Sequence, residues 1–223
     1  MITNRWGGER ISLAKDTSVA LIQTHLSRYV WSLFFCAGKS VLDVGCGTGY
    51  GTWLISTVAS DVLGLDCCAE AIQEAKQTFG EPFICTAIEE ANLNKQFDVV
   101  VCFEVLEHLT NLDIGMECLK QHMKADGVAL VSLPLHQPSE FHHKRDFGCE
   151  QWKALLEQHF QIVGVHYQFI ESNDPLDNNV SIRVAEDAGT DLWYWRRDVG
   201  LVFEPEKGIV LFILKKNDKV DIL

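Results

Sequence analysis

The chain has 223 residues, of which 47% are hydrophobic and 22% are charged. These proportions are typical of one globular domain that buries a core without disulfides or structural metals. The formal net charge of −12 argues against docking on nucleic acid or on anionic lipid through a broadly basic surface. No apolar run reaches the length of a membrane span and no apolar signal segment is visible, so we expect a cytoplasmic protein without membrane partners.

The eight cysteines predict reduced thiols rather than a disulfide framework or a zinc site. No two of them form a C-x-x-C pair, and several lie inside apolar runs, as Cys85 and Cys102 do. A free cysteine in such a run acts as a small core hydrophobe. This usage agrees with a cytoplasmic address.

The pattern of elements begins with a helix over residues 17–37, where apolar residues recur at helical spacing and Gly38 follows. Strand-like and helix-like segments then alternate along the chain. The predicted strands are 39–44, 61–66, 81–87, 97–103, 127–134, 160–170 and 207–216. The predicted helices between them are 49–59, 69–79, 104–109, 112–123 and 149–160.

This alternation predicts an α/β fold with a seven-stranded, mostly parallel sheet and helices on both faces. No helical pattern separates the last two strands, so we expect that strand pair to be antiparallel. The chain is interpreted as one domain with a helical cap (1–38), a core (39–170), an insertion (171–207) and a last strand (208–216). The insertion contains DLWYWRRDVG, and its aromatic residues predict either packing on the domain edge or a role as an acceptor lid or dimer contact.

The stretch VLDVGCGTGYG places four glycines at every second position directly after a strand. A turn without Cβ atoms lets a ligand lie against the backbone, and the following helix offers free N–H groups. Asp66 ends the second strand about twenty residues later, where an acid can accept hydrogen bonds from ribose hydroxyls. Together the glycines and the acid predict an adenosine-like ligand.

The spacing of the glycines argues against dinucleotides and polyphosphates. The dinucleotide fingerprint requires glycine where this chain has Tyr50 or Thr52, and no Gly-Lys-Ser/Thr follows the turn. Asp43 precedes the turn, where an acid would repel a pyrophosphate. It could instead act, through water or the turn backbone, on a cationic amino acid moiety.

The stretches VLDVGCGTGYG, GLD, FDVVVCFEVLEHL and MKADGVALVSLP resemble, in order and spacing, the class I S-adenosylmethionine-dependent methyltransferases. The resemblance is close over residues 39–135, and it implies a Rossmann-like fold with S-adenosylmethionine as cofactor. Residues 141–160 and the stretches GGERISL and HLSRY are similar to a subgroup often encoded beside glycosyltransferases. That similarity implies O-methylation of a sugar or related metabolite, with a small molecule or a glycan as acceptor.

The resemblance also implies roles for particular residues of the cofactor site. The expected cofactor-binding residues are Asp43, Gly45, Gly47, Gly49, Asp66, Cys67, Ala87, Ile88, Phe103 and Glu104. Relatives often carry an acid for the adenine amino group at the position of Ala87 or Ile88, which leaves that contact to Glu89 or a backbone carbonyl. Arg28 of HLSRY is implied to pair with the cofactor's carboxylate, or is an ordinary exposed helix residue.

Methyl transfer to a hydroxyl requires a base, and histidine is the most frequent one. In a helix, EVLEHL would place Glu104, Glu107 and His108 on one face, and His108 is the first predicted base. Similar triplets hold a divalent metal in some quinone-biosynthesis and RNA 2′-O-methylating relatives, but we predict no metal here. His142 is the second predicted base, ahead of His143, although both could be exposed loop residues.

Two other functions remain open at the level of the sequence. A nicotinamide-dependent oxidoreductase would share the glycines and Asp66, but the third glycine is wrongly spaced for it. A cofactor-binding pseudoenzyme or partner subunit would keep the cofactor site without turnover.

Overall fold

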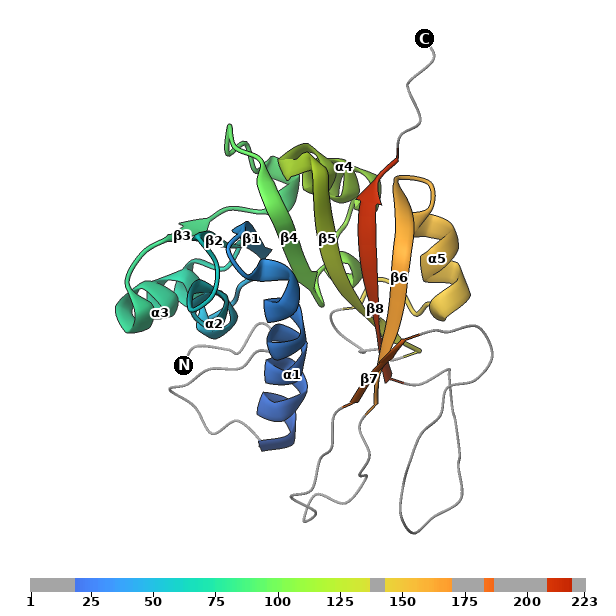
Figure 1. Cartoon of the computed structure of the whole chain (residues 1–223), viewed down its shortest axis with the longest axis horizontal. Coiled ribbons are helices and arrows are strands. Elements are labelled where there is room, and N and C mark those ends of the chain that lie inside the picture. The colour runs from blue at the N-terminus through green and yellow to red at the C-terminus, as the bar shows by residue number, and fades with distance from the viewer. Residues whose placement is uncertain (1–18, 137–142, 170–182, 187–207, 218–223) are drawn as a thin grey trace.

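The computed structural model describes residues 19–136, 143–169, 183–186 and 208–217. The strands of these ranges form one sheet in the order β3-β2-β1-β4-β5-β8-β6-β7 (Figure 1). Their bounds are Ser40–Val44 (β1), Asp61–Asp66 (β2), Phe83–Cys85 (β3), Phe97–Phe103 (β4), Met123–Leu135 (β5), Phe160–Phe169 (β6), Arg183–Glu186 (β7) and Gly208–Lys216 (β8).

The first five strands are mutually parallel, and the sheet ends in an antiparallel part. β8 runs antiparallel to both β5 and β6, as the sequence predicted for the last strand pair. The predicted α/β sheet is therefore confirmed, with one addition. β7 pairs antiparallel with the end of β6 and lies inside the segment predicted as an insertion. Its four residues are too few to give a recognisable apolar pattern, and pairing with β6 defines it.

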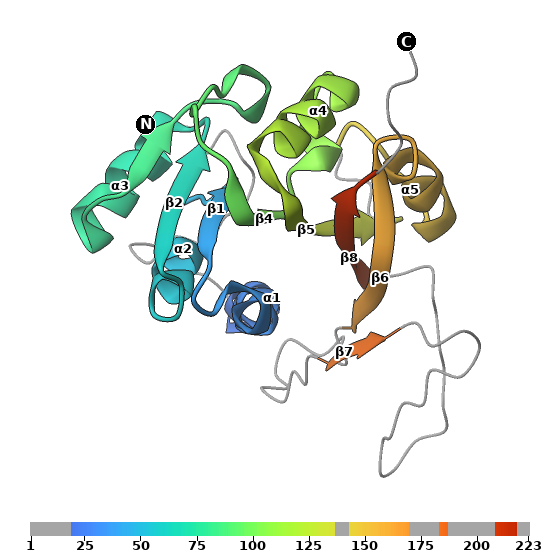
Figure 2. The same ribbon diagram turned by 45° about the horizontal axis from the view of Figure 1, so that its top comes forward.

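Helices cover both faces of the sheet (Figure 2). Their bounds are Val19–Cys36 (α1), Tyr50–Ser56 (α2), Ala69–Phe79 (α3), Leu112–His122 (α4) and Cys149–Leu156 (α5). Successive side chains of a strand point to opposite faces, and β4 is apolar on both. Val99 and Val101 belong to the core cluster with α1 and α2, whereas Val100 and Cys102 belong to the one with α4 and α5.

The segment EVLEHL differs from its prediction as a helix. Glu104 has a positive φ of 54°, and only a short 3-10 turn, η2 (Leu106–His108), follows it. The Glu104 N–H donates to the Ser132 carbonyl (3.1 Å), and its Oε1 accepts from the Ser132 hydroxyl (2.8 Å). Because these bonds hold Glu104 against β5, it does not share a helical face with Glu107 and His108.

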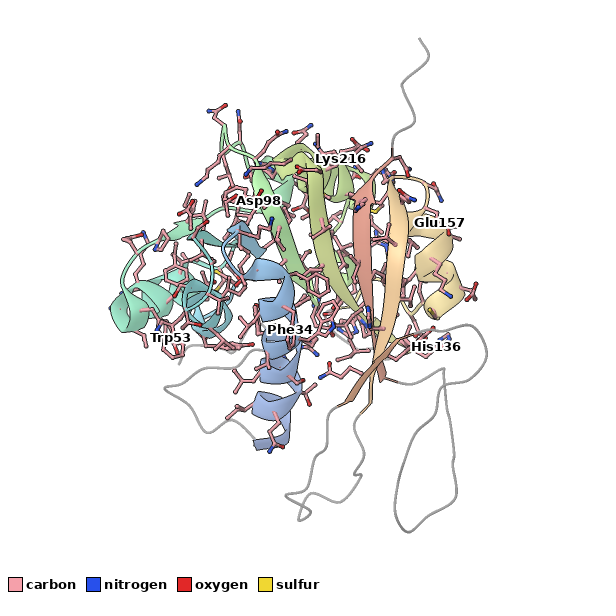
Figure 3. The ribbon with its side chains drawn as sticks, in the orientation of Figure 1. Phe34, Trp53, Asp98, His136, Glu157 and Lys216 are labelled. Carbon is pink, nitrogen blue, oxygen red and sulfur yellow. The ribbon has the colours of Figure 1, made fainter. Side chains whose placement is uncertain are left out.

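The order of the strands creates a crevice at one end of the sheet. From β1 the chain proceeds outward to β2 and β3, and then crosses to β4 and β5 on the other side. Connections that leave neighbouring strands in opposite directions open a crevice at the carboxyl ends of those strands. Figure 3 places Asp98, near the start of β4, and His136, just after β5, at opposite ends of the sheet. The crevice lies at the same end of the sheet as His136.

Two further expectations concern the helices and the thiols. Among the helices in the described ranges, none combines the length and hydropathy that a bilayer span requires. All eight cysteines are free thiols, as predicted.

Candidate active site

A cavity of about 580 Å³ occupies the crevice at the carboxyl ends of β1, β2 and β4. It is lined by α1, the turn after β1, the tip of β2, η1 (Ile88–Glu90), and the segment after β4. This volume is within the range of pockets that hold small molecules and cofactors.

The glycine turn forms the floor of the cavity through Gly45 and Gly47, whose φ angles are 73° and 55°. A Cβ on Gly45 would approach the Val105 side chain to 2.3 Å, so the turn has no room for one. The Asp66 carboxylate holds the turn in place: Oδ2 accepts from the Gly47 N–H (2.9 Å) and Oδ1 from the Cys68 N–H (2.8 Å). Asp66, at the tip of β2, thus fixes the glycine turn that follows β1.

The other two glycines of the motif serve the packing of the domain, since neither lines the cavity. A Cβ on Gly49, which has a φ of 86°, would lie 2.7 Å from the Phe83 ring. A Cβ on Gly51 would lie 2.1 Å from the Tyr29 ring. Gly49 was expected beneath a cofactor, but its position is explained by the close approach of β3 and α3.

Asp43 also lies outside the cavity lining, in β1 just before the glycine turn. Its side chain is fully buried, and it accepts hydrogen bonds from the hydroxyls of Thr52 (2.6 Å) and Tyr29 (3.2 Å). Burial raises the pKa of this carboxyl from its ordinary value of 3.8 to about 7, although both hydrogen bonds oppose the rise. The expected influence of Asp43 on a ligand is therefore indirect.

The raised pKa of Asp43 predicts a pH-dependent stability that Asp43→Asn removes. Between about pH 4 and pH 7 the folded chain holds a proton that the unfolded chain releases, so the free energy of unfolding falls as pH rises. Relative to the wild type, Asp43→Asn should gain stability from pH 5 to pH 8. Urea unfolding of both proteins at each pH measures the difference, and a constant difference would contradict the prediction.

One end of the cavity is formed by α1. His25 lines it and its Nδ1 lies 3.0 Å from the Tyr50 hydroxyl. Burial and the neighbouring Arg28 lower the pKa of His25 to about 3, so this imidazole is neutral at pH 7. Arg28 also lines the cavity, is 1% exposed, and donates from Nη1 to Oε1 of Gln168 on β6 (3.0 Å).

Neither His25 nor Gln168 was predicted from the sequence as a residue of the site. The spacing of His25, Arg28 and Tyr29 at i, i+3 and i+4 on a helix is a signal that could have revealed the first. Gln168 is one polar residue near the end of a strand, and no sequence pattern distinguishes it.

The segment after β4 forms another part of the lining. Glu107 is fully buried, and its Oε1 lies 3.7 Å from Nε2 of His108. The His143 ring lies 5.0 Å from the His108 ring, centroid to centroid. Ligand atoms of Glu107, His108 and His143 all lie within 4.8 Å of one another, a spacing that a metal ion could also use.

Hydrogen bonds hold Lys144 and Arg145 against η2 and the residues that follow it, which explains how His143 reaches this cluster. The backbone N–H of Lys144 donates to the Glu107 carbonyl (3.0 Å), and Arg145 Nη1 donates to the Leu109 carbonyl (2.7 Å). Lys144 Nζ also donates to the Thr110 hydroxyl. These bonds connect residues more than thirty positions apart in the chain.

Most of the residues predicted from the sequence come together in this cavity. Those that line it are Gly45, Gly47, Asp66, Cys67, Ala87, Ile88, Phe103, Glu104 and His108. Asp43 and Gly49 lie outside the lining, and His142 lies outside the described residues. Among the described residues, His143, which was predicted as second to His142, lies beside His108.

An open parallel sheet with a glycine turn after the first strand and an acid at the tip of the second defines a nucleoside-cofactor domain. The model of the methyltransferase domain family matches residues 12–176. The chain belongs to this family and to its S-adenosylmethionine-dependent class. This membership argues against a nicotinamide-dependent oxidoreductase.

Curated relatives are similar in sequence to part of the chain. A ubiquinone biosynthesis O-methyltransferase of Rickettsia canadensis is 34% identical over 97 residues, 41% of each chain. A malonyl-[acyl-carrier protein] O-methyltransferase of Acetivibrio thermocellus is 36% identical over 126 residues, 54% of this chain and 44% of the relative. The chain thus spans less than half the length of these two relatives.

Solved structures share the fold. The N-methyltransferase NodS of Bradyrhizobium japonicum, in complex with S-adenosylhomocysteine, superposes with a TM-score of 0.62 at 15% identity. The superposition covers 92% of this chain and 91% of that one. The predicted Rossmann-like methyltransferase fold is confirmed.

Proposed function

We propose that this domain transfers a methyl group from S-adenosylmethionine to a hydroxyl oxygen of a small acceptor, such as a sugar or a related metabolite. The observation that carries the proposal is the placement of His108, backed by the buried carboxylate of Glu107, in the same cavity as the glycine turn. A base and a cofactor floor in one cavity are what O-methylation requires.

The cavity fits the cofactor in size and in chemistry. Its volume of about 580 Å³ and its bare floor at Gly45 and Gly47 suit a nucleoside. Asp66 would accept hydrogen bonds from the ribose hydroxyls, and the adenine would lie near Cys67 and the start of η1. When bound, S-adenosylmethionine supplies the methyl group from its sulfonium.

Arg28 supports a cofactor orientation in which the adenosine lies at the Asp66 end of the cavity. Its guanidinium is almost fully buried, its Nε has no hydrogen-bond partner, and within the described residues no carboxylate pairs with it. A buried charge without an oppositely charged partner is costly, and a ligand carboxylate would supply the missing anion. We therefore place the methionine carboxylate of the cofactor at the α1 end of the cavity, with the adenosine at the Asp66 end.

His108 would act as the base. It takes the proton of the acceptor hydroxyl as the oxygen bonds to the methyl carbon and the carbon–sulfur bond breaks. The Glu107 carboxylate, 3.7 Å away, then stabilises the imidazolium. The products are the methyl ether, S-adenosylhomocysteine and a proton that His108 releases to water.

The names of the curated relatives favour oxygen as the methylated atom, since both relatives described above are O-methyltransferases. A sugar as acceptor is favoured by the similarity of residues 141–160 to the methyltransferase subgroup often encoded beside glycosyltransferases. The polar wall of Thr110, His108 and His143 suits a hydroxylated acceptor.

Labelled S-adenosylmethionine tests the proposal. The protein is incubated with panels of monosaccharides, nucleotide sugars, catechols and amines, and label is followed from the cofactor into product. Transfer to a sugar hydroxyl supports the proposal in full, and transfer to a catechol alone corrects the acceptor. Transfer only to amines, or binding without any turnover, would refute O-methylation.

The role of His108 predicts a kinetic effect without a binding effect. His108→Gln should lower kcat by about a hundredfold or more, because general base catalysis contributes that much, and leave the Kd of S-adenosylhomocysteine unchanged. His159→Gln is the matched control, since His159 bonds to Asp113 and Glu117 away from the cavity. Normal turnover of His108→Gln would exclude His108 as the base, and loss of wild-type activity on treatment with EDTA would favour a metal at the cluster.

A further inference from the structure

Gln168 of β6 lies behind the cavity wall, where it bonds to Arg28, a residue that lines the cavity. Gln168 is 1% exposed, and both ends of its side-chain amide are hydrogen-bonded to α1. Oε1 accepts from Arg28 Nη1 (3.0 Å). Nε2 donates to the Thr24 carbonyl (2.8 Å) and to the Ser27 hydroxyl (2.6 Å).

These three bonds fix the orientation of the amide as well as its position. The Thr24 carbonyl can only accept a hydrogen bond, so the amide nitrogen must face it and Oε1 must face the guanidinium. Arg28 is thereby held at Nη1 from the side of β6. Its Nε has no hydrogen-bond partner among the described residues. A guanidinium can bind a carboxylate through two parallel hydrogen bonds, from Nε and one Nη.

Among the described residues, Arg28 supplies the positive charge at the α1 end of the cavity, because its neighbours there are uncharged. His25 is held neutral, with a pKa of about 3, and Tyr50 bonds to His25. The opposite end carries the Asp66 carboxylate, which suits hydroxyls and repels anions. A ligand with an adenosine at one end and a carboxylate at the other therefore fits in one direction only.

We infer that Gln168 is a positioning residue for cofactor recognition: it orients Arg28 so that the guanidinium receives the carboxylate of the methionine moiety. The inference rests on the cofactor orientation given under the proposed function. It assigns to β6, a strand outside the parallel half of the sheet, the selection of the amino acid end of the cofactor. Gln168 itself makes no contact with the ligand in this role.

Two nucleosides test this role without any turnover. S-Adenosylhomocysteine has the carboxylate, whereas 5′-methylthioadenosine lacks the whole amino acid moiety. By calorimetry, Arg28→Met should weaken binding of S-adenosylhomocysteine by about tenfold or more and change binding of 5′-methylthioadenosine less than about twofold. Gln168→Leu should weaken binding of S-adenosylhomocysteine by about threefold to tenfold, again with little change for 5′-methylthioadenosine.

The double variant separates positioning from a general structural effect. If Gln168 acts through Arg28, then Arg28→Met with Gln168→Leu should bind S-adenosylhomocysteine no more weakly than Arg28→Met alone. Ser32→Ala is the matched control in α1, because Ser32 is buried and its hydroxyl donates to the Tyr29 carbonyl (2.7 Å). It should change the two affinities by the same factor.

Gln168→Glu keeps the inference testable if Gln168→Leu does not fold. A carboxylate at 168 would pair with Arg28 and compete with the ligand, so only S-adenosylhomocysteine should bind more weakly. Equal losses for both nucleosides in the Arg28 and Gln168 variants, or additive losses in the double variant, would overturn the positioning role. Failure of the wild type to bind either nucleoside would overturn the cofactor orientation and the inference together.

Discussion

Asp66→Ala is expected to weaken binding of S-adenosylhomocysteine by about a hundredfold and to lower the melting temperature. The carboxylate would accept hydrogen bonds from the ribose, and hydrogen bonds to charged groups contribute roughly 1.5–3 kcal/mol each. It also accepts the N–H groups of Gly47 and Cys68, which would lose their acceptor. Calorimetry and thermal unfolding measure the two effects.

Asp61→Ala is the matched control for Asp66→Ala. Asp61 begins the same strand, is exposed, and pairs with Lys95 at the surface. The change in net charge is the same, but a surface ion pair contributes only about 0–1 kcal/mol and lies at the opposite end of β2. Asp61→Ala should leave the affinity unchanged. An unchanged affinity in Asp66→Ala would place the ribose elsewhere.

Gly51→Ala is expected to destabilise the domain, although a change from glycine to alanine inside a helix usually stabilises the helix. Alanine is favoured over glycine in helices by roughly 0.5–1 kcal/mol. In this chain the added Cβ would lie 2.1–2.5 Å from three atoms of the Tyr29 ring. Overpacking of this kind costs about 1–3 kcal/mol. Urea unfolding should therefore show a loss of stability.

The affected ring is confined on several sides, which prevents an easy adjustment. Tyr29 is 5% exposed, packs edge-on against Phe103 and Tyr50, and donates to Asp43. Displacement of the Tyr29 ring should also disturb Arg28, the preceding residue on α1, and weaken binding of the cofactor. In a Tyr29→Leu background, which lacks the far end of the ring, Gly51→Ala should become neutral or stabilising. If it remains equally destabilising there, the Tyr29 contact is not the cause.

Local patterns in the sequence determined the alternation of strands and helices and the antiparallel end of the sheet. They also located the glycine turn and Asp66, because a ligand that lies against a strand–turn–helix junction requires residues at fixed short spacings. Nine of the predicted site residues line one cavity, and for several of them, such as Cys67, Ala87 and Phe103, the family resemblance rather than a local pattern implied the role. The conformation of EVLEHL was not predictable from its pattern, because the bonds of Glu104 to Ser132 on β5 replace the helix.

The roles of Gly49, Gly51 and Gln168 were decided by the tertiary structure alone. The two glycines follow the same spacing as Gly45 and Gly47, yet the rings of Phe83 and Tyr29, distant in sequence, determine why no Cβ fits. Gln168 reaches Arg28 across 140 positions of chain. A sequence records short-range geometry directly, whereas contacts between distant segments exist only after the sheet has brought β6 and α1 together.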